Sequence, residues 1–170
     1  TRHYGIPADK IMVVHNGHDE PATAVTPTLI ARHGGHRSPL VLFLGRLTVQ
    51  KNPWQFLEIA KKVNRFRPDA QFVMAGDGPM LPTLLDRACE LGLSHNIVFT
   101  GKLARRETRA LYAEADCFVM PSLSEPFGLV ALEAIAHRTP VIVSKQSGVA
   151  EVLDHAFKVD YWDADLMADC

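Results

Sequence analysis

Short apolar runs, each followed by a stretch with helical periodicity, recur along most of the chain. The run 40–44 is apolar throughout, and the stretch 53–66 after it carries Phe56, Ala60 and Val63 on one face. Strands that are apolar on both sides and separated by helices indicate a parallel sheet covered on both faces, so we predict an α/β fold. The five or six expected strands are 40–44, 70–75, 97–100, 117–120, 140–144 and 157–159. The expected helices are 53–66, 80–91, 106–114, one from Gly128 to 136, and a short one over 148–153.

The first part of the chain lacks this rhythm. We expect 10–14 to form a short strand that ends at a turn over 15–19. The stretch 21–39 is rich in proline and threonine, which is typical of a connector. We therefore predict that 1–38 is an interdomain or connector segment and that 39–170 is the folded domain.

Composition narrows the classes of partner. A chain of 170 residues is long enough for one domain with a substantial core. Its 18 basic and 19 acidic residues leave no net field to attract nucleic acid or an anionic membrane, and no apolar run approaches the length of a membrane span. Cys89, Cys117 and Cys170 are odd in number and scattered, which predicts free thiols in a reducing compartment and hence a cytoplasmic protein. The stretch 163–168 resembles a helix start cut short, so we expect the C-terminal end of the domain to be truncated.

The strand-to-helix loops should meet at one edge of the sheet. Right-handed crossovers place every such loop beyond the carboxyl ends of the strands, and ligands of open, Rossmann-like sheets bind there. The chemistry of the domain should therefore lie in these loops. They are 45–52, 76–79, 101–105, 121–127 and 145–148.

The stretch 116–133 is the most informative of these regions. It predicts a strand, a loop holding Glu125, and a helix in which Glu133 is the one charged residue among apolar neighbours. A helix that is apolar almost all round should be buried on more than one face, and a carboxylate inside it needs a polar partner. Helical side chains lean toward the N-terminus, so Glu133 should point back toward Glu125 and the positive end of the helix dipole. An anion seat beside two carboxylates suits a ligand with both phosphate and hydroxyl groups, such as a nucleotide sugar.

Two cations follow the first strand of the regular sheet. Arg46 and Lys51 can reach over the strand ends and clamp a phosphate group. Each residue taken alone also fits a solvated charge in a loop. Opposite the helix start at Gly128, the pair could neutralise a diphosphate from the other side.

Other candidate motifs favour structural interpretations. The loop Gly76-Asp77-Gly78-Pro79 lacks both the third glycine of a dinucleotide fingerprint and the lysine of a P-loop, and we read it as a tight turn with Pro79 starting the next helix. Two histidine pairs, His15 with His18 and His33 with His36, are not joined by a third ligand at diagnostic spacing, so no metal site is expected. No histidine accompanies Ser122 in a nucleophile elbow, which argues against a hydrolase. A solvated face is the favoured interpretation of a basic run made of Lys102, Arg105, Arg106 and Arg109.

Taken together, these motifs resemble the C-terminal, donor-binding domain of the retaining family-4 glycosyltransferases, which have the two-domain GT-B fold. The paired glutamates become specific within Glu125-Pro126-Phe127-Gly128-Leu129 and Glu133-Ala134, with Gly45-Arg46-Leu47 upstream. The resemblance covers nearly the whole chain. It also includes Asn16-Gly17 with Asp19, Gln50-Lys51, 75–79, 98–101, Pro121-Ser122, Pro140-Val141-Ile142, and Gly148 with Glu151.

The resemblance implies a role for each position. Arg46 and Lys51 would hold the diphosphate and stabilise the leaving nucleotide, and Glu125 would bind hydroxyls of the transferred sugar; these three are the expected catalytic residues. Glu133 would meet the ribose hydroxyls, and 100–103 would lie beside the nucleobase. No metal or other cofactor is implied. The full set of expected donor-binding residues is Gly45, Arg46, Lys51, Gly101, Lys102, Leu103, Glu125, Phe127, Gly128, Leu129, Val130 and Glu133.

The same resemblance implies that this chain is half of an enzyme. A GT-B enzyme works between two domains, and its N-terminal domain, which supplies the acceptor site and would carry any membrane contact, is not in these residues. We therefore expect a hexosyltransferase half that uses a UDP-, GDP- or ADP-sugar and is inactive alone. A binding-only module and another GT-B enzyme, such as a sugar-nucleotide epimerase or an inverting transferase, remain as alternatives. The sequence departs from the family at Ser147, where the first glycine of a pair is usual, and at Asn52, where glycine is common.

Overall fold

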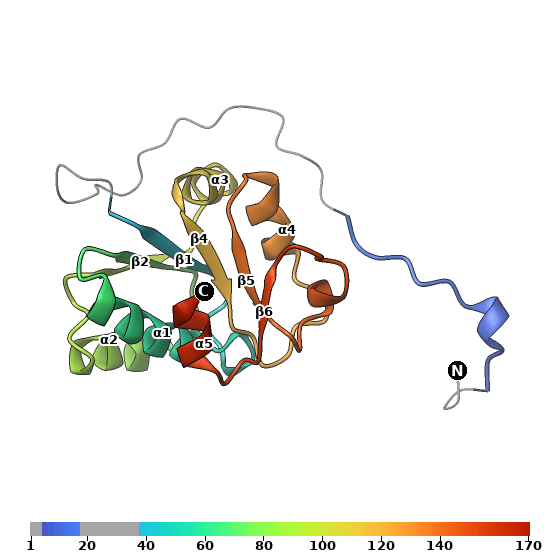
Figure 1. Ribbon diagram of the computed structural model, residues 1–170, viewed down its shortest axis with the longest axis horizontal. Helices are drawn as coiled ribbons and strands as arrows, with labels where there is room; N and C mark the ends of the chain where they lie inside the picture. Colours follow the sequence, from blue (N-terminus) through green and yellow to red (C-terminus); the bar gives the residue numbers. More distant parts are fainter. Residues whose placement is uncertain (1–4, 18–37) are drawn as a thin grey trace.

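The protein is described by a computed structural model that covers residues 5–17 and 38–170. In these residues six strands form one sheet in the order β3-β2-β1-β4-β5-β6 (Figure 1), and every neighbouring pair is parallel. The prediction of a Rossmann-like α/β fold with five or six parallel strands is confirmed. The strands are β1 (Leu40–Leu44), β2 (Gln71–Ala75), β3 (Ile97–Gly101), β4 (Cys117–Met120), β5 (Val141–Ser144) and β6 (Phe157–Val159).

Helices cover both faces of this sheet. Helices α1, α2 and α5 lie on one face and α3 and α4 on the other (Figure 1). They are α1 (Pro53–Phe66), α2 (Leu81–Glu90), α3 (Arg105–Glu114), α4 (Leu129–Ala136) and α5 (Ala164–Asp169). Short 3₁₀ helices are η1 (Ala8–Lys10), η2 (Val49–Lys51) and η3 (Gly148–Glu151).

Each strand supplies side chains to two cores, which explains why the strands are apolar throughout. In β1, Leu40 and Leu42 pack on the side of α3 and α4, whereas Phe43 packs on the side of α1 and α2. The Phe43 ring lies 5.6 Å from the ring of Phe56 on α1. Because successive side chains of a strand point to opposite faces, a sheet covered twice needs apolar residues at both parities.

The prediction of a strand at 10–14 is wrong. Lys10 closes the 3₁₀ turn of η1, and 11–17 is unpaired, with Met12 83% and Val13 74% exposed. A strand requires a hydrogen-bonded neighbour, and within the described residues this segment pairs with neither edge strand, β3 or β6. The turn predicted over 15–19 and the connector over 21–39 lie largely outside the described residues.

Two helical segments also differ from the predictions, one in its type and one in its first residue. The segment expected as a helix over 148–153 is the 3₁₀ helix η3, because Ala150 and Val152 donate their N–H groups three residues back. Helix α3 begins at Arg105, where the Glu107 carboxylate accepts the N–H of Ala104 at 2.7 Å and caps the first turn.

Cysteines and apolar helices give two further observations. Cys89, Cys117 and Cys170 are free thiols, and burial raises the pKa of Cys117 to about 12. In the described part of the chain, every helix is too short or too polar to span a bilayer.

The sheet order places its switch point between β1 and β4. The chain runs outward from β1 through β2 to β3 and then returns to build β4, β5 and β6 on the other side. The loops after β1 and β4 therefore leave neighbouring strands and diverge. Ligands of open parallel sheets bind at such a point, beyond the carboxyl ends of the strands.

Candidate functional site

The loops after β1 and β4 are joined to each other. The Leu123 N–H donates to the Gln50 carbonyl at 3.0 Å, and the Asn52 amide donates to the Pro121 carbonyl at 3.1 Å. An ion pair between the Lys51 ammonium and a carboxylate oxygen of Glu125 adds a third link. These contacts bring two of the expected catalytic residues together although 74 positions separate them.

Two glycines let the neighbouring loops approach this junction. A Cβ atom on Gly76 would lie 1.9 Å from the Gly45 carbonyl oxygen, and one on Gly78 would lie 2.4 Å from that of Leu47. The interpretation of 76–79 as a tight turn therefore agrees with the structure. The expected helix start at Pro79 is wrong, because the turn continues to Met80 and α2 begins at Leu81.

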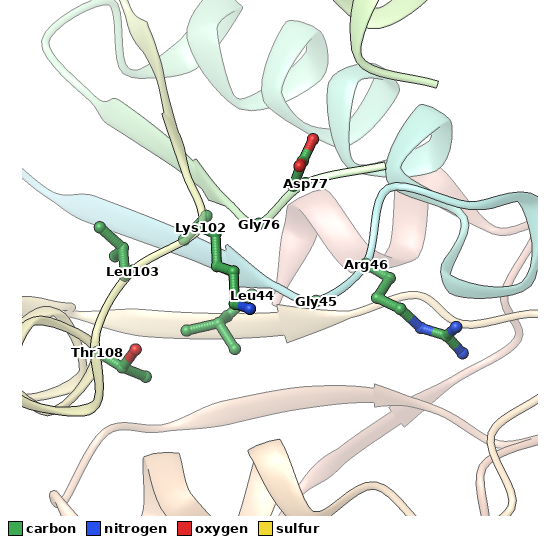
Figure 2. Close-up of a pocket in the computed structure, with 9 residues that line it drawn as sticks. Leu44, Gly45, Arg46, Gly76, Asp77, Lys102, Leu103 and Thr108 are labelled. Atoms are coloured by element: carbon green, nitrogen blue, oxygen red, sulfur yellow. The ribbon is translucent and has the colours of Figure 1, made fainter. Parts of the chain in front are cut away.

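A cavity of about 460 Å³ opens beyond β1, β2 and β3, and we call it the β1–β3 cavity. Figure 2 shows Lys102 reaching back over Leu44, Arg46 extending away from Lys102, and the Asp77 carboxylate pointing away from both. One Asp77 carboxylate oxygen accepts the N–H of Gly78 at 2.7 Å. The full lining is Leu44, Gly45, Arg46, Ala75, Gly76, Asp77, Lys102, Leu103 and Thr108.

A second cavity of about 330 Å³ lies at the start of α4, and we call it the α4 cavity. Lys51 and Glu125 line it together with Asn16 and the residues from Pro126 to Val130. Gly128 precedes the helix with φ of 110°, a conformation that favours glycine. The ring of His15 stacks on that of Phe127, with centroids 6.0 Å apart. This contact brings the next residue, Asn16, to the wall of the cavity. The N–H groups and dipole of α4 make this an anion-favouring place.

A third cavity of about 400 Å³ lies between α3 and α4, and we call it the α3–α4 cavity. It shares Leu103 and Thr108 with the β1–β3 cavity, so the two adjoin. Arg105, which is exposed as a solvated face predicts, and the half-buried Arg109 both line it. Its remaining lining residues are Tyr112, Glu133 and His137.

Glu133 has a protein partner that the sequence did not reveal. The Tyr112 hydroxyl donates to a carboxylate oxygen of Glu133 at 3.0 Å. Burial raises the pKa of Tyr112 far above its usual range, so the hydroxyl keeps its proton and acts as the donor. The polar partner that a carboxylate in an apolar helix requires is therefore supplied, at one oxygen, by the protein itself.

Helix α4 is also less enclosed than predicted. Ala131 and Ala134 are buried, but Leu129 is 43% and Ile135 40% exposed. The helix packs on β4 and β5 and also contacts α3, whereas the side that carries Leu129 and Ile135 stays exposed. The expectation of burial on more than one face agrees with the contacts to the sheet and to α3, but the remaining side of the helix is open, because apolar composition reports only that a helix can be buried.

The predicted site residues fall along one edge of the sheet. Gly101 lines none of the three cavities; it ends β3, where its carbonyl accepts the N–H of Gly76 at 2.9 Å. Thr108 and Tyr112 were missed, although their four-residue spacing places them on one face of the predicted helix 106–114. The β1–β3 cavity holds Gly45, Arg46, Lys102 and Leu103; the α4 cavity holds Lys51, Glu125, Phe127, Gly128, Leu129 and Val130; the α3–α4 cavity holds Leu103 and Glu133.

The histidine motifs add no ligand set to this edge. Within residues 5–17 and 38–170, no three His, Cys, Asp or Glu side chains gather where they could hold a metal ion. His18, His33 and His36 lie outside the described residues.

Comparisons with known proteins identify a family and agree with the fold. Residues 27–162 match the family Glycosyl transferases group 1. The chain is 36% identical over 159 residues to an uncharacterized glycosyltransferase of Methanocaldococcus jannaschii. The matched residues cover 89% of this chain and 40% of that protein. It resembles the C-terminal domain of a group 1 glycosyl transferase from Francisella tularensis, with a TM-score of 0.71, 28% identity, and coverage of 77% and 72% of the two chains.

A more distant structure shares the fold. An Anabaena protein crystallised with UDP and glucose gives a TM-score of 0.71 at 23% identity, over 78% of this chain and 37% of that one. At this identity the likeness concerns the fold alone. The chain spans about two fifths of the length of its Methanocaldococcus relative and 35% of an α-D-kanosaminyltransferase from Streptomyces kanamyceticus, so each of these relatives is much longer.

Proposed function

The chain belongs to the group 1 glycosyl transferases, and from this premise we propose that its sheet edge binds the nucleotide-activated sugar of a retaining hexosyltransferase. The observation that carries the proposal is the junction of the β1 and β4 loops. There the Lys51–Glu125 pair stands beside the start of α4, with Arg46 in the same loop as Lys51. Cations, a helix N-terminus and a carboxylate together suit a ligand that joins a diphosphate to a sugar.

Each cavity takes one part of this donor in the proposal. The base enters the β1–β3 cavity beside Leu103, the ribose meets Glu133, and the transferred sugar lies against Glu125. The diphosphate lies between Arg46, Lys51 and the N–H groups at the start of α4. When the bond between the sugar carbon and the diphosphate oxygen breaks, negative charge grows on that oxygen, and these positive groups stabilise it. We expect no metal ion in this role.

The acceptor belongs to another part of the enzyme in this proposal. Because the chain spans about two fifths of the length of its Methanocaldococcus relative, we propose that a further domain supplies the acceptor site. That domain would also carry any contact of the enzyme with a membrane. The chain described here would then bind the donor and transfer no sugar by itself.

Arg46 provides the first test, because it is exposed and has no ion-pair partner among the described residues. UDP, GDP and ADP are screened by thermal shift, since a ligand that binds only the folded chain raises its melting temperature. Arg46→Ala should weaken the best of these by about tenfold or more, the worth of a hydrogen bond to a charged group. It should leave the affinity for the matching nucleoside and the melting temperature without ligand unchanged.

Arg106→Ala is the matched control for this measurement. Arg106 is an exposed arginine that lines none of the three cavities, so its loss should not change binding. Equal weakening of nucleoside and nucleoside diphosphate by Arg46→Ala would assign Arg46 a structural role. If none of the three diphosphates binds, the proposed function is wrong.

Substitutions of the two glutamates should weaken the binding of different ligands. Glu133→Gln should weaken the bare nucleoside diphosphate several-fold, because a neutral amide accepts hydrogen bonds less strongly than a carboxylate. Glu125→Gln should leave that affinity nearly unchanged, or slightly raise it by releasing Lys51, and should remove the extra affinity for the intact sugar nucleotide. Calorimetry with both ligands on both variants measures the split. A Glu125→Gln variant that loses the bare diphosphate as strongly as the sugar nucleotide would contradict this placement of the sugar.

A further inference from the structure

The Glu133 carboxylate is held by a side chain from the neighbouring helix. The Tyr112 hydroxyl is the one side-chain group of the described residues that hydrogen-bonds this carboxylate, and it does so through a single oxygen. Tyr112 comes from α3 and Glu133 from α4, and both line the α3–α4 cavity. One carboxylate oxygen is thereby fixed by the protein, and the other is left to accept hydrogen bonds from a ligand.

Tyr112 is itself held on several sides. Its side chain is 1% exposed, and its carbonyl accepts the Thr139 hydroxyl at 2.6 Å. Its ring lies edge-on to Phe118 of β4, with centroids 5.8 Å apart, and stacks on His137 at 5.5 Å. The His137 ring N–H donates in turn to the Glu133 carbonyl at 2.8 Å. His137 therefore links the Tyr112 ring to the backbone of α4. The hydroxyl therefore has a fixed position relative to the backbone of Glu133.

A fixed position matters because Glu133 has other attractions nearby. Arg105 and Arg109 line the same cavity, and a glutamate side chain that is free to rotate can turn toward either guanidinium. Such freedom would have to be lost again when a ligand binds, which lowers affinity. We propose that Tyr112 is a positioning residue that keeps the Glu133 carboxylate directed at the ribose hydroxyls of the donor. This inference rests on the proposed role of Glu133 in donor binding.

The test compares ribose with a sugar that lacks its hydroxyls. Affinities for UDP, GDP and ADP and for their 2′,3′-dideoxy forms are measured by calorimetry, and the tightest pair gives the ribose preference. The chain should prefer the ribose form by about tenfold, as expected for hydrogen bonds to a charged group. Tyr112→Phe keeps both ring contacts and removes only the hydroxyl, and it should reduce this preference at least threefold. Tyr161→Phe, the same change in a tyrosine outside the three cavities, should leave it intact.

Two further variants show whether Tyr112 acts through Glu133. Adding Tyr112→Phe to Glu133→Gln should reduce the ribose preference no further than Glu133→Gln alone, because the group to be positioned is already gone. Glu133→Asp withdraws the carboxylate from the hydroxyl by one methylene group and should resemble Tyr112→Phe, which covers the case in which Tyr112→Phe does not fold.

The outcomes separate the inference from its premise. If the unaltered chain shows no ribose preference, the proposed role of Glu133 is wrong and the inference falls with it. If the preference exists and survives in Tyr112→Phe, or in Glu133→Asp, Tyr112 does not position the carboxylate. Additive losses in the Tyr112→Phe, Glu133→Gln double variant would show that Tyr112 acts by another route.

Discussion

Lys51→Ala should lower both the melting temperature of the chain and its affinity for a nucleoside diphosphate. The Lys51 side chain is 20% exposed and pairs with Glu125, whose side chain is only 9% exposed. Removing the ammonium leaves a nearly buried carboxylate without its counter-charge, which costs about 1–3 kcal/mol of stability. If Lys51 also contacts the diphosphate, the same change should weaken that ligand by about tenfold or more.

A double variant separates the two effects. In Lys51→Ala with Glu125→Gln no unpaired charge remains, so most of the lost stability should return while the affinity for the diphosphate stays low. Lys62→Ala is the control, because the Lys62–Asp165 pair is exposed, with Asp165 81% accessible, and such pairs contribute about 0–1 kcal/mol. Chemical denaturation and calorimetry measure the two quantities. Recovery of affinity in the double variant would mean that Lys51 acts on binding only by restraining Glu125.

This coupling between Lys51 and Glu125 could not be predicted from the sequence. Both residues were identified as site candidates, because each follows an apolar strand and parallel strands end at a common edge. Their contact depends on how the loop after β1 folds over the loop after β4, which is set by the Leu123–Gln50 and Asn52–Pro121 hydrogen bonds. Strand periodicity carries no information about such loop-to-loop bonds.

The pairing of Tyr112 with Glu133 was hidden for a related reason. The spacing of apolar residues places Tyr112 on the buried face of α3. From the sequence alone, a tyrosine at such a position is interpreted as part of the hydrophobic core. Its partner belongs to another helix, and the sequence does not specify the angle at which α3 and α4 meet. The wrong strand at 10–14 shows the same limit in reverse, since apolar residues with strand propensity become a strand only beside a partner.

Gly148→Ala should disrupt the sugar end of the site more than any change of a neighbouring side chain. A Cβ atom on Gly148 would lie 2.2 Å from the Pro126 carbonyl oxygen and 3.1 Å from the Phe127 Cα, both of which are backbone atoms. The Gly148 N–H donates to the Glu125 carbonyl at 2.9 Å, and the Val149 N–H donates to that of Phe127 at 2.6 Å. The segment after β5 is thus hydrogen-bonded to the backbone of the Glu125 loop. A methyl group on Gly148 must push that loop away.

Ser147 explains why this glycine, and not its neighbour, is required. The Ser147 side chain is buried, and its hydroxyl donates to the Ser144 carbonyl at 2.7 Å, so the usual glycine pair is not needed at this position. Gly148→Ala should cost about 1–3 kcal/mol of stability through overpacking and should weaken the sugar nucleotide more than the bare nucleoside diphosphate. Ser147→Gly should cost at most about 1 kcal/mol and leave the ratio of the two affinities unchanged. Because Glu125 stands at the sugar in the proposed site, a Gly148→Ala variant that lost both ligands equally would show that the loop supports the whole donor and not its sugar alone.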